Sequence, residues 1–147
     1  SLLPCFDRTV LLAAILLTAF ALPRIAAGSF AKPALIFAMI DVESDYRADT
    51  VGDGGDSLGL LQIQERWHRE RMERLGCTDL LDPYQNVTVG VDFLSELIAY
   101  YDGDVTKAVI AYNMGQAGAQ RNCFDLGIYS TKYSEAVFSE AAGLVEA

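Results

Sequence analysis

Residues 33–62 read PALIFAMIDVESDYRADTVGDGGDSLGLLQ. Pro33 suits the first turn of a helix, and the residues that follow it are apolar on nearly every side. Such a helix is expected to be buried. After Glu43 the pattern changes to a segment rich in Gly and Asp, and apolar residues return at Gly59-Leu60-Leu61-Gln62. The stretch therefore predicts a buried helix, then a turn-rich loop or small hairpin, then a return to the core.

Two carboxylates, Asp41 and Glu43, lie at the end of this apolar helix. Carboxylates are rarely buried unless they are paired or face a cleft, so their presence here needs an explanation. Near the last helical turn, the helix dipole and apolar neighbours both disfavour a negative charge and raise the pKa of Glu43. A carboxylic acid that stays protonated near neutral pH suits the general acid of glycosidic-bond cleavage. From position alone, a solvated helix end is the alternative.

The composition excludes several classes of function. With 147 residues, 52% of them hydrophobic, the chain can form one domain with a substantial core. Its net charge of -9 disfavours binding to nucleic acid and provides no basic membrane patch. The single histidine, His68, makes a histidine metal site or a Ser-His-Asp triad improbable. Asp53 and Asp56 lack the spacing of a calcium-binding EF-hand, so we expect no metal and no cofactor.

The N-terminal segment has features of an export signal. Arg8 precedes an apolar run from Thr9 to Leu22, which Pro23 and a group of small residues follow. The run is short for a transmembrane span and fits the apolar region of a secretory signal. We therefore predict an export segment at residues 1–28 and an extracytoplasmic domain at residues 29–147. Retention of residues 9–22 as a membrane anchor, or as a core helix of the domain, is the alternative.

Two cysteines, Cys77 and Cys123, fall in the predicted domain, whereas Cys5 falls in the N-terminal segment. In an oxidising compartment the pair could form a disulfide, and two buried free thiols are the alternative.

Capping residues and apolar stripes predict further helices after the loop. They cover Glu65–Leu75, a segment from about Asn86 to Tyr100, Val105–Asn113, Gln120–Leu126 and Lys132–Leu144. In the first of these, Trp67 is expected to be an apolar packing contact, with stacking on sugar rings as the alternative.

Five separate motifs occur in the order typical of the soluble lytic transglycosylases, a family of peptidoglycan-cleaving enzymes. The chain resembles this family from about Ala31 to about Ser139. The motifs are Glu43-Ser44, Gly59-Leu60-Leu61-Gln62, Asp82-Pro83-Tyr84-Gln85-Asn86 followed by Gly90 and Leu94, Ala111-Tyr112-Asn113-Met114-Gly115, and Tyr133 with Val137. The chain departs from the family in having Leu61 where Met is usual, and its glycine-rich loop lacks a Ser-Ala-Gly-Ala pattern.

The resemblance implies a mainly α, lysozyme-like single domain, of the kind shared with goose-type lysozyme, with a short β-hairpin or loop after the catalytic helix. It implies that Glu43 is catalytic and that five residues bind substrate: Ser44, Gln62, Tyr112, Asn113 and Tyr133. Each has an alternative role that the residues themselves suggest. Gln62 could satisfy backbone groups of the loop, Asn113 could cap a helix, and the two tyrosines could be packing residues.

The family also implies a reaction. Glu43 would protonate the bond between N-acetylmuramic acid and N-acetylglucosamine and then accept the proton of the muramic 6-hydroxyl, which closes a 1,6-anhydro ring. Peptidoglycan strands would be the partner, without cofactor, and we expect a monomer. If Asp45, Asp53 or Asp56 holds a water opposite Glu43, the enzyme would instead be a goose-type lysozyme-like hydrolase. A domain that binds peptidoglycan without cleaving it is a third possibility.

Overall fold

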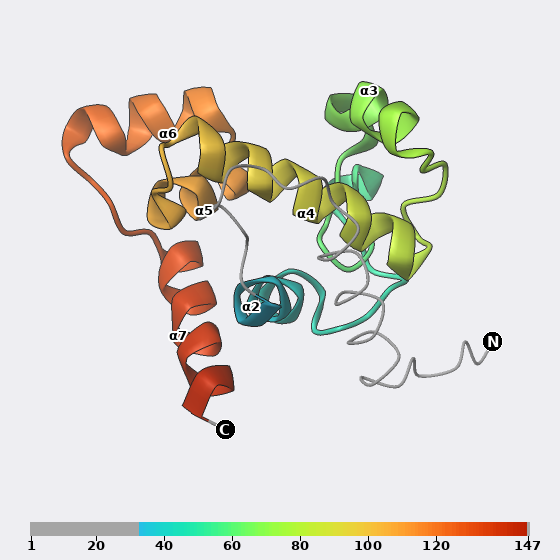
Figure 1. The fold of residues 1–147 in the computed structure, drawn as a ribbon, viewed down its shortest axis with the longest axis horizontal. Helices are drawn as coiled ribbons and strands as arrows, with labels where there is room; N and C mark the ends of the chain where they lie inside the picture. The colour runs from blue at the N-terminus through green and yellow to red at the C-terminus, as the bar shows by residue number, and fades with distance from the viewer. Residues whose placement is uncertain (1–32, 147) are drawn as a thin grey trace.

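The computed structural model describes residues 33–146, so the predicted export segment and Cys5 lie outside the described residues. This part of the chain is mainly α with one small antiparallel hairpin, as predicted (Figure 1). The elements are α2 (Pro33–Ser44), β1 (Val51–Gly52), β2 (Ser57–Leu58), α3 (Glu65–Leu75), α4 (Pro83–Tyr100), α5 (Val105–Met114), α6 (Gln116–Asn122) and α7 (Lys132–Glu146), with 3-10 turns at Asp53–Gly55 (η1) and Phe124–Leu126 (η2). None of the helices in residues 33–146 has the length and hydropathy needed to cross a bilayer.

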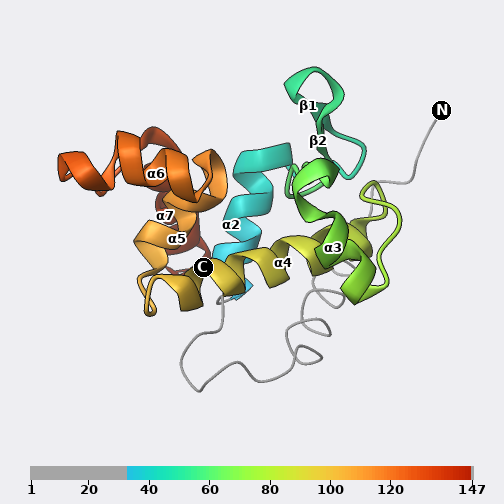
Figure 2. The same ribbon diagram turned by 90° about the horizontal axis from the view of Figure 1, so that it is seen from above.

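The long helix α4 crosses the molecule, with α3 near one end and α5 and α6 near the other (Figure 1). Helix α7 packs along α2, and α4 packs against α3 and α5. Seen from above, α2 runs so that its C-terminal end points to the side from which the hairpin projects (Figure 2). The end of the buried helix and the hairpin therefore lie on the same side of α4.

Helix α2 is the apolar helix that the sequence predicts. Its buried apolar side chains are Leu35, Ile36, Ala38, Met39 and Ile40, each 6% exposed or less. Directly after the helix, Asp45 and Tyr46 both adopt left-handed backbone conformations, with φ of 52° and 59°. The hydroxyl of Tyr46 donates to the Phe37 carbonyl at 3.1 Å and so folds the chain back against the helix. This sharp turn leaves Glu43 in the last turn of α2.

Helix α4 begins at Pro83, a few residues before the start predicted near Asn86, because Asp82 caps it. The Asp82 carboxylate accepts a hydrogen bond from the Gln85 backbone N–H at 2.8 Å. Asn86 is fully buried within the helix, where its Oδ1 accepts from the Leu61 N–H at 2.8 Å. Its Nδ2 donates to the carbonyls of Leu58 and Leu80, both at 2.7 Å. One amide thus satisfies three backbone groups and holds the loop after β2 against α4.

The turn that Asn86 holds has no room for a side chain at Gly59. Its φ of 73° is left-handed, and a Cβ there would lie 2.4 Å from both the Leu80 carbonyl oxygen and the Asn86 Nδ2. A glycine is therefore needed at this position for the loop to reach the helix.

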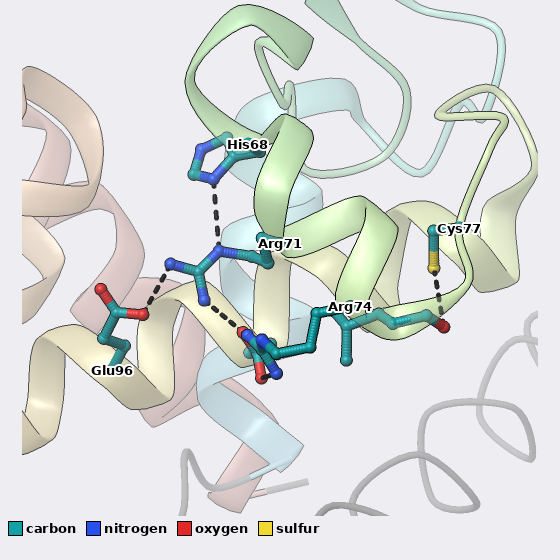
Figure 3. Close-up of polar contacts among 7 residues, drawn as sticks. His68, Arg71, Arg74, Cys77 and Glu96 are labelled. Atoms are coloured by element: carbon teal, nitrogen blue, oxygen red, sulfur yellow. Dashed lines mark hydrogen bonds and ion pairs between the residues drawn. The ribbon is translucent and has the colours of Figure 1, made fainter.

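Charged groups hold α3 to α4. Arg71 pairs with Asp92 and, at 2.8 Å, with Glu96, and its Nε donates to the Nδ1 of His68 at 3.3 Å (Figure 3). Arg74 also pairs with Asp92, at 2.6 Å. Burial and, next, the Arg71 charge lower the pKa of His68 to about 4, so this histidine is a neutral acceptor near neutral pH. His68 is buried, accepts a hydrogen bond from Arg71 and packs on Phe93, so we assign it a structural role.

The region after α5 differs from the prediction of a single helix over Gln120–Leu126. Gly115, with φ of 77°, ends α5 and allows α6 to begin at once. Helix α6 ends at Asn122 because Cys123 leaves the helical conformation, and η2 is a separate 3-10 turn. Because Gly115 lies between the two helices, α6 begins at Gln116 and not at the predicted Gln120.

Cys77 and Cys123 are both buried free thiols. They follow α3 and α6 respectively, which lie near opposite ends of α4 (Figure 1). Of the two alternatives, a disulfide or two buried free thiols, the structure shows the free thiols.

Replacement of the Asn86 amide tests how the loop is held. We expect Asn86→Ala to lower the free energy of unfolding by about 3 kcal/mol, because three buried backbone groups lose their partner. Thr88→Ala is the control on the same helix, since the Thr88 hydroxyl only donates to the Tyr84 carbonyl of its own helix. Urea unfolding measures both variants. A loss below about 1 kcal/mol for Asn86→Ala would contradict the role given to this side chain.

Candidate active site

Glu43 and Tyr133 meet where α2 and α7 pack together. The Tyr133 hydroxyl donates to Glu43 Oε1 at 2.6 Å, across 90 positions of sequence. Glu43 is half-buried, and Tyr133 packs against the edge of the core. The carboxyl group is thus held in one place by a donor from a different helix.

The environment keeps Glu43 close to its protonation midpoint at neutral pH. Burial raises the pKa of Glu43 to about 7, against the lowering effect of the hydrogen bond from Tyr133, and the charge of Asp53 raises it further. The direction agrees with the expectation from the sequence, and burial is the largest cause. A carboxyl group with this pKa can give up a proton and take one back near neutral pH.

The charge of the same carboxyl group acts on Tyr112, but the Tyr112 hydroxyl makes its hydrogen bond to the loop after β2. Its hydroxyl donates to the Leu61 carbonyl at 3.0 Å, and its ring lies 5.2 Å from that of Phe93. Burial, followed by the charge of Glu43, raises the pKa of Tyr112 well above its ordinary value. The same two causes raise the pKa of Tyr133. Both phenols are therefore neutral hydrogen-bond donors, and Tyr112 braces the loop after β2 rather than the acid.

Gln62 and Ser44 use their side chains inside the protein. Gln62 has a left-handed φ of 49°, and its Nε2 donates to the carbonyls of Gly59 at 2.9 Å and Thr50 at 3.2 Å. Ser44 is buried, and its hydroxyl donates to the Ile40 carbonyl one helical turn back at 3.1 Å. The loop role of Gln62 that the residues suggested is thus present, and substrate binding by either residue stays a prediction.

Asn113 lies next to Tyr112 near the end of α5 and is exposed. Its side chain makes no hydrogen bond to any other residue in the range 33–146. Gly115, not Asn113, caps the helix. The amide is free to meet a ligand, and its role there stays a prediction.

Asp53 is the residue that sequence reasoning did not distinguish from its neighbours. It sits in the hairpin with a left-handed φ of 49°, and its Oδ2 accepts from Ser57 Oγ at 2.5 Å and from Gln64 Nε2 at 3.3 Å. Among the loop carboxylates, its charge is the one that acts on Glu43. The antiparallel register, with Gly52 opposite Ser57, brings these groups together, and no local sequence signal gives that register.

No three His, Cys, Asp or Glu side chains in the described part of the chain are grouped so that they could hold a metal ion. The chemistry that the described residues offer is proton transfer at Glu43, with the neutral Tyr133 hydroxyl as its hydrogen-bond donor and the charge of Asp53 acting on it.

The chain is similar to known proteins in sequence and in fold. Residues 25–125 match the transglycosylase SLT domain family, a range that includes Glu43, Gln62, Tyr112 and Asn113 and ends before α7. The fold is similar to that of an inactive mutant of the lytic transglycosylase Slt from Pseudomonas aeruginosa, with a TM-score of 0.66 and 22% sequence identity. The likeness covers 94% of this chain and 24% of that one, so the chain spans about a quarter of that protein. Since the family match covers most of its length, the chain belongs to the transglycosylase SLT domain family.

Proposed function

We propose that the chain cleaves peptidoglycan as a lytic transglycosylase, with Glu43 as the single acid and base. The observation that carries this proposal is a half-buried carboxyl group with a pKa of about 7, fixed by the Tyr133 hydroxyl. Membership of the transglycosylase SLT domain family supports it. So does the similar Slt structure, whose inactive mutant has glutamine in place of a glutamate. Peptidoglycan lies outside the cytoplasmic membrane, so the proposal includes extracytoplasmic action.

In the first step, protonated Glu43 gives its proton to the oxygen that links N-acetylmuramic acid to N-acetylglucosamine. Tyr133 donates to Oε1, so we assign the transferable proton to Oε2. The bond to the anomeric carbon breaks, and the substrate's N-acetyl group stabilises the positive charge that develops there. No second protein carboxylate is needed for this step.

In the second step, the Glu43 carboxylate takes the proton of the muramic 6-hydroxyl as that oxygen bonds to the anomeric carbon. The product is a 1,6-anhydro ring, and Glu43 returns to its protonated form without consuming water. The Tyr133 hydrogen bond stabilises the carboxylate between the two steps, whereas burial favours the protonated acid. Because these two effects oppose each other, Glu43 can both give up and accept a proton near neutral pH.

A second candidate function, hydrolysis, is favoured by the position of Asp53. Ser57 and Gln64 both donate to its Oδ2 and hold this carboxylate in the hairpin, and its charge acts on Glu43. A water held by Asp53 could attack the anomeric carbon in place of the 6-hydroxyl. The enzyme would then be a lysozyme-like hydrolase that uses two carboxyl groups.

Analysis of the products separates these functions. We expect the wild-type chain to release anhydromuropeptides from purified peptidoglycan, detected by mass spectrometry, and Glu43→Gln to release none, because glutamine cannot transfer the proton. Products that are heavier by one water would identify a hydrolase. Binding to peptidoglycan without release of any product would contradict both enzymatic proposals and favour a wall-binding module.

The role of Asp53 has its own variant. If the 6-hydroxyl attacks, Asp53→Asn should reduce turnover by less than about tenfold, since only the electrostatic surroundings of Glu43 change. If Asp53 positions water, turnover should fall by 100-fold or more. Asp49→Asn is the control, because Asp49 is an exposed carboxylate in the segment just before the hairpin.

The pH dependence tests the bond between Tyr133 and Glu43. That hydrogen bond lowers the pKa of Glu43, so Tyr133→Phe is expected to raise this pKa above about 7. Because the acid must be protonated to act, the alkaline limb of the kcat profile should move to higher pH. Tyr84→Phe, which alters an exposed tyrosine, should leave the profile unchanged. An alkaline limb that stays in place or moves to lower pH in Tyr133→Phe would count against the assigned contact.

A further inference from the structure

Trp67, the single tryptophan of the chain, lies in the first turn of α3 with 73% of its surface exposed. The expectation that it packs against the protein is therefore wrong. The buried side chains of this helix are His68 and Met72, which are 8% and 7% exposed. An indole is the largest apolar group that a protein can leave in water, so its exposure here needs a reason other than core packing.

Polar contacts hold the exposed indole in place. Its Nε1 donates to Gln64 Oε1 at 3.2 Å, and an Arg66 guanidinium nitrogen donates to the same oxygen at 3.1 Å. The guanidinium carbon of Arg66 lies 5.3 Å from the centroid of the indole ring, and Arg66 also pairs with Asp56 of the hairpin at 3.3 Å. A ring that is ordered before a ligand arrives loses little conformational freedom on binding.

The same contacts connect Trp67 to the candidate active site. Gln64, which accepts from the indole, donates through Nε2 to Ser57 Oγ at 3.1 Å and to Asp53 Oδ2 at 3.3 Å. Asp53 is the carboxylate whose charge acts on Glu43. Trp67 is thus connected through Gln64 to Asp53, the hairpin carboxylate whose charge raises the pKa of Glu43.

We propose that Trp67 is a sugar-binding platform, on which a saccharide unit of the glycan strand stacks at a distance from the bond that is cleaved. This inference rests on the proposed function, because it takes the glycan strand as the ligand. The C–H face of a pyranose ring is apolar and matches an aromatic face, whereas the ring hydroxyls can reach the polar groups around Gln64. Stacking needs no positive charge, which suits a chain of net charge -9 that binds a polymer carrying anionic groups.

Fluorescence tests the platform directly, because the chain has one tryptophan. The Glu43→Gln variant, in which turnover is expected to be absent, is titrated with soluble, uncross-linked glycan strands. We expect the emission maximum to shift to the blue by several nanometres and acrylamide quenching to fall at least twofold as sugar covers the indole. Binding that calorimetry detects while emission and quenching stay constant would overturn the platform.

The same titration with vesicles containing phosphatidylglycerol covers a second use of an exposed tryptophan, insertion at a membrane surface. No change is expected with these vesicles. A blue shift with vesicles and none with glycan strands would overturn the sugar platform in favour of membrane contact.

Kinetics on the same strands give an independent readout. We expect Trp67→Ala to raise KM about tenfold and to change kcat less than threefold, because the contact lies away from the reacting bond. Trp67→Phe, which keeps an aromatic face, should recover most of the loss. Tyr100→Ala is the control, since Tyr100 is a 65% exposed aromatic at the end of α4.

The outcomes for Trp67 and Glu43 are separable. If Trp67→Ala has the KM of the wild type while Glu43→Gln abolishes turnover, the platform is wrong and the proposed function stands. If the wild type binds strands without cleaving them, the proposed function fails, and the fluorescence titration still decides the platform. If it neither binds nor cleaves them, both fail.

Discussion

The backbone of Leu61 is held on both sides, and the geometry of the site depends on this restraint. The Asn86 amide accepts from its N–H, and the Tyr112 hydroxyl donates to its carbonyl. Two helices, α4 and α5, are thereby fixed to the loop that follows the hairpin. The hairpin carries Asp53, so the restraint also limits where that carboxylate can lie relative to Glu43.

Two opposing effects set the pKa of the Glu43 carboxyl group. Burial by α2 and its neighbours disfavours the charged form, and the hydrogen bond from Tyr133 on α7 favours it. The packing of α7 on α2 therefore has a chemical consequence, because it brings in the donor that limits the rise in pKa. Helix α7 thus supplies the Tyr133 donor and also packs against the helix that carries the acid.

Features set by neighbouring residues could be predicted from the sequence. Pro33 begins α2, Gly76 ends α3 in a left-handed conformation, and the Asp104 side chain caps α5. The apolar character of α2 likewise identified Glu43 as a carboxyl group in an unfavourable place. Each of these features depends on residues that are neighbours in the sequence, so the local sequence is enough to predict it.

Features set by distant partners could not be predicted. The bonds from Asn86 to Leu58 and Leu61 have no local signal in the sequence, because they depend on how the loop meets α4. Trp67 was expected to pack, and its exposure follows from polar contacts to Gln64 and Arg66 that no apolar pattern encodes. Asp53 could be separated from the other loop carboxylates only after the hairpin register was known.

The proposed role of Glu43 as a proton donor near neutral pH depends on its pKa, which can be measured directly. In protein labelled with 13C at the glutamate side-chain carboxyl, the Glu43 resonance is assigned by its absence in Glu43→Gln and followed through a pH titration. We expect a midpoint of about 7. A midpoint close to the ordinary value of 4.5 would contradict it, because the carboxyl group would then be ionised and unable to protonate the glycosidic oxygen.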